Sequence, residues 1–331
     1  MADTYTQHET ALARVAAFVE ALPGVSPHFA GKYRMLADPV RGRQRLRLLE
    51  YELEIARFQP RGEVVLDAGA GTGLYSVLFA LLGAARVEAI DFFPQNVEFL
   101  ERLAKEFALP IAPRLADIAH TGLADGSVGL VYCTEAISHF HCWQAFLDEA
   151  ARLIRPGGRV LIADGNNGAN PAILRAIHRF WDASERGPFS SADFPAGRNL
   201  PYLFRRWMII RRTFPDATDE QVFQLGLRTS DRGGAELIEA CRSYFATGEL
   251  PGGGYRYGQS QHRPEDGQRN EEPLDPRAIA GYLRGRGLRA VARAHFGFNR
   301  SPLLPAMNRA ASLLGTLPLR FSERYLVIAT K

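Results

Sequence analysis

The chain has 331 residues, which is enough for one large core or for one core with a cap. Its formal net charge is +4, and its arginines are interleaved with acids apart from one cluster at Arg41, Arg43, Arg45 and Arg47. A dedicated nucleic-acid-binding protein more often carries a concentrated basic face, so the charge pattern disfavours that class, and we interpret the cluster as a solvated helix face.

The cysteines and the N-terminus indicate the compartment. Cys133, Cys142 and Cys241 are irregularly spaced and form no C-x-x-C pair, which argues against a disulfide framework and against a zinc site. The N-terminus lacks a basic and apolar signal pattern, and no apolar run reaches the roughly 20 residues that span a bilayer. We therefore expect a cytoplasmic protein with no membrane span and no metal.

Two helices are predicted ahead of the first strand. Apolar residues at helical spacing predict one over 8–22, which Pro23-Gly24 ends, and a second over 43–58, which ends before Pro60. We expect this N-terminal segment to pack over the carboxyl edge or the flank of the sheet and to cover the ligand site.

The next hundred residues alternate between strand and helix. Strands are predicted at 64–66, 86–91, 110–116, 128–133 and 159–163. Helices are predicted from Leu74 onward, over 94–107 and over 144–154, the last closed by the turn 155–158. This alternation predicts a parallel sheet with helices on both faces.

The alternation stops after the fifth strand. Helices are predicted over most of the following 120 residues, and their starts are marked by Asn170-Pro171, Thr218-x-x-Gln221 and Asp275-Pro276. Among them, 252–267 is a polar stretch long enough to be functional or disordered. Strand character returns in two segments, 288–298 and 324–330.

A glycine-rich turn, Asp67-x-Gly69-x-Gly71-x-Gly73, follows the first strand. Glycine suits such a turn because some positions need φ above zero and because a ligand must approach the backbone closely. The dinucleotide fingerprint needs a glycine where Leu74 stands, and a phosphate-binding P-loop needs a lysine that is absent here. The turn is therefore typical of a nucleotide-binding α/β domain but of neither of these two sites.

Four stretches in order resemble one family: the turn at 67–73, Asp91 at the end of the second strand, Asp117 followed by 123–127, and 146–158. They resemble the class I S-adenosylmethionine-dependent methyltransferases, within the small-molecule branch that includes the ubiquinone-biosynthesis C-methyltransferases. The resemblance implies an α/β, Rossmann-like, mostly parallel seven-stranded sheet with helices on both faces. The long helical segment after strand five departs from the family pattern and predicts a helical cap inserted between strands five and six. We therefore expect N-terminal helices at 1–60, a cofactor-binding core at 61–165, a helical insertion at 166–286 and closing strands at 287–331.

The resemblance also implies S-adenosylmethionine as cofactor, S-adenosylhomocysteine as product, and no metal. Asp91 would accept hydrogen bonds from the ribose hydroxyls, although a strand-end acid can also cap the next helix. Asp117 would accept from the adenine amino group, and Ile118 would pack on the ring. Asp67 would orient the turn, and Tyr33 would close over the cofactor's carboxylate. The predicted cofactor residues are Tyr33, Asp67, Ala68, Gly69, Gly71, Thr72, Gly73, Asp91, Phe92, Asp117, Ile118, Cys133 and Thr134.

The predicted catalytic residues follow the fourth strand, whose carboxyl end faces the transferred methyl group in this fold. They are Glu135, His139 and His141. His139 sits where the family often has a histidine, and we interpret it as a general base or a substrate contact, with a backbone-bonded histidine at a helix start as the alternative. Glu135 suits a contact to cofactor or to substrate equally well.

The insertion supplies the predicted substrate residues, Trp181, Arg206, Trp207, Tyr255 and Tyr257. Aromatic rings beside arginines suit a planar substrate, including an acidic one. The alternative is that the tryptophans pack in a core and the arginines lie on the surface. Because the family usually has one helix here, we expect a substrate cap, a homodimer interface, or both.

We therefore predict a methyltransferase that moves a methyl group by in-line displacement to O, C or N of a small aromatic, polyketide-like or quinone-like metabolite. The alternatives are an RNA or protein methyltransferase and a non-methylating S-adenosylmethionine-binding protein. Base-amino methylation uses an Asn/Asp-Pro-Pro-aromatic run where this chain has Cys133-Thr-Glu-Ala136, and Cys133 lacks the flanking proline of cytosine-C5 sites. A small molecule is thus the expected partner, and nucleic acid is not.

Overall fold

The computed structural model describes residues 4–187, 200–296 and 304–331. The chain divides into two compact units: unit 1 is Met1–Ala169 with Leu274–Lys331, and unit 2 is Asn170–Pro273. Over the described ranges, none of the helices is both long enough and apolar enough to cross a membrane.

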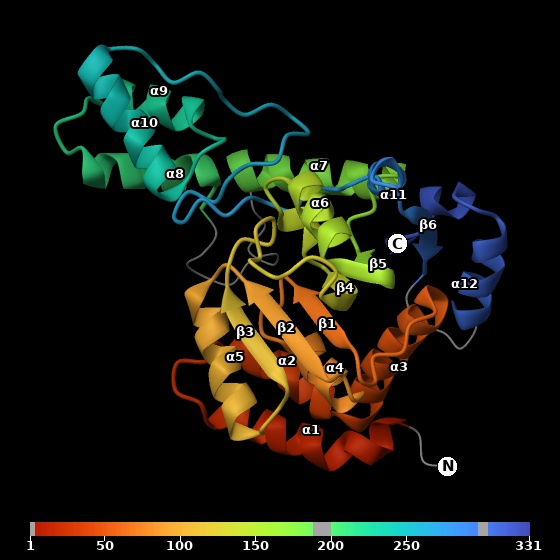
Figure 1. Ribbon diagram of the computed structural model, residues 1–331. Helices are drawn as coiled ribbons and strands as arrows, with labels where there is room; N and C mark the ends of the chain where they lie inside the picture. Colours follow the sequence, from red (N-terminus) through yellow and green to blue (C-terminus); the bar gives the residue numbers. More distant parts are fainter. Residues whose placement is uncertain (1–3, 188–199, 297–303) are drawn as a thin grey trace. The chain divides into compact units, whose positions relative to one another are not determined.

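Unit 1 is built on a seven-stranded sheet with the order β3-β2-β1-β4-β5-β7-β6 (Figure 1). The first five strands in this order pair in parallel, whereas β7 runs antiparallel to both of its neighbours. The strands are β1 Val64–Ala68, β2 Arg86–Asp91, β3 Ile111–Leu115, β4 Val128–Thr134, β5 Ile154–Asp164, β6 Arg289–His295 and β7 Arg324–Thr330. The predicted Rossmann-like sheet is confirmed. Its order reverses between β1 and β4, where ligands bind beyond the carboxyl ends of such sheets.

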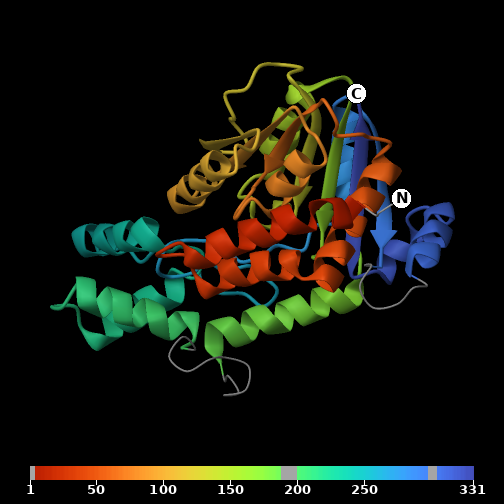
Figure 2. The same ribbon diagram turned by 90° about the horizontal axis from the view of Figure 1, so that it is seen from below.

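Helices cover both faces of this sheet, as predicted (Figures 1 and 2). Successive strand residues point to opposite faces. Val65 and Leu130 pack with α1, α3, α4 and α5, while Leu66 and Val131 pack with α6 and α11. These helices are α1 Thr4–Ala21, α3 Pro39–Ala56, α4 Leu74–Leu81, α5 Pro94–Glu106, α6 Trp143–Leu153 and α11 Pro276–Gly285. Each fully buried leucine contributes about 1.5–3 kcal/mol to the stability of the sheet.

Three helices rather than two precede the sheet, because α2 (Pro27–Ala37) lies between the two that were predicted. Ser26 caps α2, and Pro27 occupies its first turn, which is a start signal in the sequence. Asp38 ends α2 and begins α3, where its Oδ1 accepts from the Arg41 N–H at 2.8 Å. The Tyr5 hydroxyl donates to the Ala37 carbonyl at 3.0 Å, which fastens this elbow to α1.

Two element boundaries differ from the prediction. The strand β5 already begins at Ile154, which pairs with Val128, and the register shifts between Val128 and Leu130. A Cβ atom on the intervening Gly129 would lie 2.4 Å from the Glu63 carboxylate, so the shift accommodates that side chain. The strand predicted over 288–298 is β6, which ends at His295, and residues 297 and 298 lie outside the described residues.

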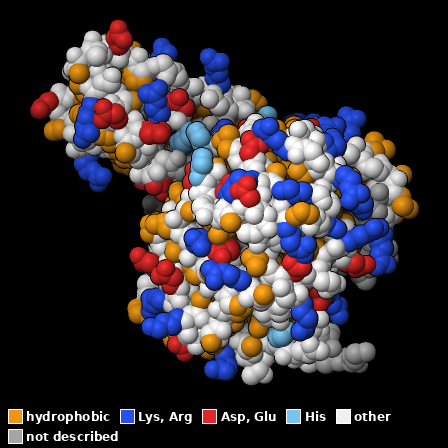
Figure 3. Space-filling view, viewed as in Figure 1, with side chains coloured by type: hydrophobic (Ala, Val, Ile, Leu, Met, Phe, Trp, Pro, Cys, Tyr) orange, Lys and Arg blue, Asp and Glu red, His pale blue; other side chains and the backbone are white. Residues whose placement is uncertain are grey.

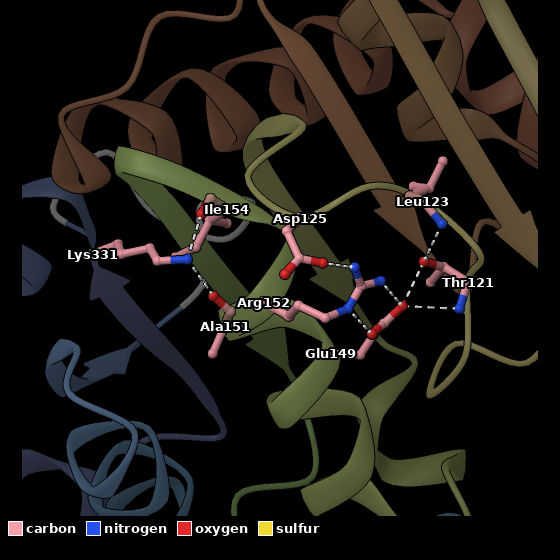
Figure 4. Close-up of polar contacts among 8 residues, drawn as sticks. All are labelled: Thr121, Leu123, Asp125, Glu149, Ala151, Arg152, Ile154 and Lys331. Carbon is pink, nitrogen blue, oxygen red and sulfur yellow. Dashed lines mark hydrogen bonds and ion pairs between the residues drawn. The ribbon is translucent and has the colours of Figure 1, made fainter.

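A buried carboxylate joins two of the stretches that carry the family resemblance (Figure 4). Glu149 on α6 accepts from the Thr121 hydroxyl at 2.6 Å and from the Arg152 guanidinium at 2.7 and 2.8 Å. Arg152 also pairs with Asp125. Although burial raises the pKa of Glu149, the hydrogen bonds from Arg152 and Thr121 outweigh it and hold the pKa at about 2. This network fastens the 117–127 loop to α6.

The described residues of unit 2 form the helices α7 Pro171–Arg186, α8 Tyr202–Thr213, α9 Asp219–Arg228 and α10 Gly234–Thr247. The predicted capping box is present, since Gln221 N–H donates to the Thr218 hydroxyl at 3.2 Å and Thr218 N–H donates to the Gln221 side chain at 2.8 Å. Ile210, Val222 and Leu225 form part of a separate apolar cluster. This helical segment lies between β5 and β6 in the chain, where the insertion was predicted, and its role as a cap stays a prediction.

Candidate functional site

The glycine turn adopts the backbone geometry that its sequence requires. Gly69, Gly71 and Gly73 have φ of 73°, 55° and 70°, a region that favours glycine. A Cβ atom on Gly69 would lie 2.8 Å from the Ala136 Cβ, and one on Gly73 would lie 1.9 Å from Leu100 Cδ2. A Cβ atom on Gly71 would meet nothing within 4 Å. Gly69 and Gly73 are therefore required by the close packing around them, whereas the space beside Gly71 is open.

A cavity of about 540 Å³ lies against this turn, and we refer to it as the cofactor cavity. It is formed entirely by unit 1, from α2, α3, the turn, α4 and the end of β4. Its lining residues are Lys32, Met35, Leu36, Arg41, Gln44, Arg45, Asp67, Gly69, Ala70, Gly71, Thr72, Leu74, Tyr75, Thr134 and Glu135. The carboxyl ends of β1 and β4 thus meet the N-terminal helices at the switch point of the sheet.

Charge in the cofactor cavity is divided between its two sides. The cations, Lys32, Arg41 and Arg45, come from α2 and α3, and the acids, Asp67 and Glu135, come from the ends of β1 and β4. The Arg45 guanidinium donates to the Tyr75 hydroxyl at 3.0 Å, whereas half-buried Lys32 has no hydrogen bond or ion pair to another described residue. Burial, together with the charge of Arg45, lowers the pKa of Lys32. The ammonium therefore favours an anionic ligand.

Asp67 and Tyr33 hold the glycine turn in place through buried hydrogen bonds. Asp67 is 3% exposed, and its Oδ2 accepts from the Ser76 hydroxyl at 2.6 Å. Burial raises the pKa of Asp67 to about 6, against the effect of the hydrogen bonds from Ser76. The Tyr33 hydroxyl is buried and donates to the Thr72 carbonyl at 2.6 Å. In this structure Tyr33 therefore braces the turn and does not line the cofactor cavity.

Asp91 ties the turn to α5. Its Oδ2 accepts from Gly71 N–H at 2.8 Å, and its Oδ1 accepts from Phe93 N–H at 2.9 Å and from the Asn96 amide at 3.1 Å. This is the helix-capping arrangement that the sequence offered as the alternative. A carboxylate has about four acceptor positions, so one remains for a ribose hydroxyl. Phe92, beside it, is 63% exposed, and its contact to the cofactor stays a prediction.

The residues predicted to hold adenine follow β3. Asp117 is exposed and caps its own loop, where it accepts from Ala119 N–H at 2.8 Å. Ile118 is half-buried against the core on the α6 face. Leu115, the last residue of β3, pairs with Asp91 in the sheet. Asp117 and Ile118 follow it closely in the chain and therefore lie near the end of β2. Asp117 and Ile118, like Asp91 and Phe92, lie outside the lining of the cofactor cavity, so their contacts to ribose and adenine stay predictions.

The predicted catalytic residues follow the end of β4 and differ in whether they line the cofactor cavity. Thr134 and Glu135 line the cofactor cavity, whereas His139 and His141 do not. Glu135 has φ of 49°, pairs with Arg324 and accepts from Gly165 N–H at 3.3 Å. His139 is half-buried in the 3-10 turn η1 (Ile137–His139), its N–H donating to the Ala136 carbonyl at 2.9 Å, and His141 is exposed.

Ala68 and Cys133 lie under the site as buried core residues. Burial, followed by the charges of Asp164 and Asp67, raises the pKa of the Cys133 thiol well above its ordinary value. The thiol is therefore held protonated, which disfavours a nucleophilic role.

The predicted substrate residues mostly serve the packing of unit 2. Arg206 is wholly buried, pairs with Glu185 and donates to the Gly226 carbonyl at 2.9 Å. Trp181 is 3% exposed, and the ring of Trp207 lies 5.3 Å from that of Phe223. The contacts of these three residues are those of a core. Tyr255 lies under the guanidinium of Arg186, at 5.0 Å, and Tyr257 is 61% exposed.

The sequence did not single out the cationic wall of the cofactor cavity. Lys32 received no role, and the arginine cluster was interpreted as a solvated helix face. A signal was present in the spacing, because Arg41, Gln44 and Arg45 stand at i, i+3 and i+4 and therefore share one face of α3. Arg47 is on a different face and is exposed.

Comparison with known proteins finds relatives of the segment that contains the glycine turn. Residues 66–162 match a family model described as a methyltransferase domain. The chain is 33% identical over 112 residues to a ubiquinone biosynthesis O-methyltransferase of Xanthomonas axonopodis pv. citri (strain 306), covering 34% of this chain and 46% of that protein. It is 35% identical over 105 residues to a demethylmenaquinone methyltransferase of Tropheryma whipplei (strain Twist), covering 31% and 42%. A solved S-adenosylmethionine-dependent methyltransferase from Mesorhizobium loti is 13% identical, with a TM-score of 0.44 over 85% of this chain and 98% of that one.

The chain thus spans less than half the length of these two relatives, 46% and 42%. The shared region contains the glycine turn, Asp91 and the end of β4, and of these the turn and the end of β4 line the cofactor cavity together with the N-terminal helices. Residues 66–162 of unit 1 are therefore similar to a methyltransferase domain, and the matched relatives are methyltransferases named for ubiquinone biosynthesis and for demethylmenaquinone.

Proposed function

We propose that unit 1 binds S-adenosylmethionine with its amino-acid end in the cofactor cavity and transfers the methyl group to a small organic molecule. The observation that carries this proposal is the divided charge of the cavity, with cations on α2 and α3 and acids at the ends of β1 and β4. An amino-acid group has a carboxylate and an ammonium, so it complements both sides. When bound, S-adenosylmethionine supplies an electrophilic methyl group on a sulfonium.

The chain's own residues hold and orient this ligand. Lys32 and Arg45 face the carboxylate, and Asp67 and Glu135 face the ammonium. The backbone at Gly71 allows close approach because no Cβ atom fills the space above it. At the other end of the turn, the remaining acceptor position of Asp91 takes a ribose hydroxyl, and Asp117 with Ile118 bounds the adenine.

The acceptor atom is O, C or N of a small aromatic or quinone-like metabolite. Support comes from the two relatives, which are named for ubiquinone biosynthesis and for demethylmenaquinone. Of the predicted catalytic residues, Glu135 lines the cofactor cavity, so we assign it the contact nearest the reacting groups. His139, in the 3-10 turn that follows Glu135, is the candidate base if the acceptor loses a proton.

Unit 2 is assigned either the selection of the acceptor or a homodimer contact. Five large apolar side chains on α8, α9 and α10 are between 36% and 46% exposed: Phe204, Met208, Phe223, Leu227 and Phe245. Apolar exposure of this kind is typical of a binding surface. Sedimentation of the protein over a concentration range separates the two roles, since only a homodimer contact predicts self-association that Phe223→Ser weakens.

Two other functions fit less well. On the face shown in Figure 3, acidic side chains lie among the basic ones over unit 1, which differs from the continuous basic surface of most RNA-binding proteins. A non-methylating protein that binds the same cofactor would have the same turn, so only chemistry separates it from an enzyme.

The test is methyl transfer from S-adenosylmethionine labelled on its methyl group. The protein is incubated with quinone precursors and other small aromatic metabolites, and with RNA and protein fractions as separate arms. Label in a small organic product supports the proposal. Label only in RNA or protein contradicts the acceptor class, and binding of S-adenosylhomocysteine with no transfer in any arm favours the non-methylating alternative.

A further inference from the structure

A second cavity, of about 570 Å³, adjoins the cofactor cavity at the elbow between α2 and α3. The two cavities share Lys32, Met35 and Arg41 in their walls, so they lie next to each other within unit 1. Arg34 and Asp38 belong only to the second one. We refer to it as the elbow cavity.

The elbow cavity carries positive charge that the described residues do not neutralise. Its cations are Lys32, Arg34 and Arg41, and its one acid is Asp38. Asp38 is already engaged as the cap of α3, where its Oδ1 accepts from Arg41 N–H at 2.8 Å. Arg34 reaches Glu20 at 3.3 Å, but Lys32 and the Arg41 side chain have no hydrogen bond or ion pair to another described residue. The surplus favours an anionic ligand.

The rest of the elbow cavity is apolar or open. Met35 is 41% exposed and lines both cavities, and Pro27 also lines the elbow cavity. A Cβ atom on Gly31 would approach only the end of the flexible Arg34 side chain, at 3.9 Å. A planar apolar body therefore has both room and a contact surface, while its charged group can reach the cations.

We propose that the elbow cavity binds the methyl acceptor, and that this acceptor is a small organic acid with an apolar body and an anionic group held by Arg34 and Arg41. The inference rests on the proposed function, because the position of the acceptor follows from that of the cofactor cavity next door. On transfer, the acceptor atom would form its bond to the methyl carbon as the carbon–sulfur bond breaks. Sulfur would keep the electron pair, and a proton on the acceptor atom would pass to the candidate base, His139, and from there to solvent.

The cofactor has a carboxylate of its own, and Lys32 lines both cavities. A substitution at Arg34 distinguishes the acceptor from the cofactor, because Arg34 lines only the elbow cavity. An acceptor acid bound there must respond to Arg34→Gln, whereas a carboxylate bound only in the cofactor cavity must not.

Binding is measured by calorimetry with 2-naphthoate and with 2-naphthamide, which has the same body and no charge. Each titration is made with and without saturating S-adenosylhomocysteine. The wild type should bind the acid about tenfold more tightly than the amide, the effect of one hydrogen bond to a charged group. Arg34→Gln and Arg41→Gln should each reduce this preference about threefold, as for partly exposed charges. Arg47→Gln, an exposed arginine of the same helix outside both cavities, is the matched control.

Equal binding of acid and amide by the wild type, or of neither at about 1 mM, overturns the inference. So does a preference that Arg47→Gln reduces as much as Arg34→Gln and Arg41→Gln do. If S-adenosylhomocysteine binds and the acid is not preferred, the elbow inference alone fails. If S-adenosylhomocysteine does not bind, the proposed function fails, and the titrations without it decide whether the cavity selects acids.

Discussion

Replacing Lys32 by methionine should weaken S-adenosylhomocysteine binding about tenfold. Lys32 is half-buried in the wall of the cofactor cavity and has no hydrogen bond or ion pair to another described residue. Burial and Arg45 lower its pKa, so an anionic ligand that pairs with it gains from a charge that is poorly compensated in the free protein. A hydrogen bond to a charged group contributes about 1.5–3 kcal/mol, and partial exposure places the effect at the low end.

The assay compares S-adenosylhomocysteine with its decarboxylated analogue by calorimetry. Wild-type protein should prefer the ligand that has the carboxylate, and Lys32→Met should bind both about equally. Lys105→Met, the same change at an exposed lysine near the end of α5, should keep the wild-type preference. An unchanged preference in Lys32→Met would refute the reasoning, and an equal loss of both ligands would mean that Lys32 supports the fold instead.

Three further outcomes follow from buried carboxylates. Asp91→Ala should weaken the binding of S-adenosylhomocysteine by about 1–3 kcal/mol. Unchanged affinity in calorimetry would show that Asp91 does not bind the ribose. Glu149 has its pKa lowered from an ordinary 4.5 to about 2, so its contribution is complete above pH 4.5 and is lost as the pH falls through 2. Urea unfolding should show a loss of about 1–2 kcal/mol across this window that Glu149→Gln lacks, after allowance for the part-exposed Arg152. Burial raises the pKa of Glu52, whose Oε2 accepts from the Tyr132 hydroxyl at 2.8 Å, to about 7. The folded state therefore favours its protonated form and loses stability as the pH rises from 4.5 to 7, and Glu52→Gln should remove this loss, seen as a higher melting temperature at pH 8.

The glycine turn could be predicted from sequence because its constraint is local. Gly69 and Gly73 have positive φ and sit against Ala136 and Leu100, so the chain must place glycine there whatever the ligand. The sheet could be predicted for a similar reason, because the hydrophobic pattern that indicates a strand or a helix is contained within about 15 residues.

The cationic wall could not be predicted in the same way. Lys32 and Asp67 line the same cavity because α2 packs beside the end of β1. Neither the sequence of α2 nor that of β1 indicates that the two elements lie together. Tyr33 shows the same limit, because its hydroxyl reaches Thr72, 39 residues away, and braces the turn instead of covering the ligand. Arg206 was assigned to substrate by residue type, whereas its partner is the buried Glu185 on the preceding helix.

The most direct test of the account compares two glycines that both have positive φ, only one of which lines the cofactor cavity. Gly71 and Gly62 have φ of 55° and 75°, and a Cβ atom on either would meet nothing within 4 Å. Alanine at each position therefore strains the backbone by a similar amount, about 1–2 kcal/mol, but only Gly71 lines the cofactor cavity. The account predicts similar melting temperatures for Gly71→Ala and Gly62→Ala, with S-adenosylhomocysteine binding lost only in Gly71→Ala. Equal affinity in the two variants, or no binding by the wild type, would contradict it.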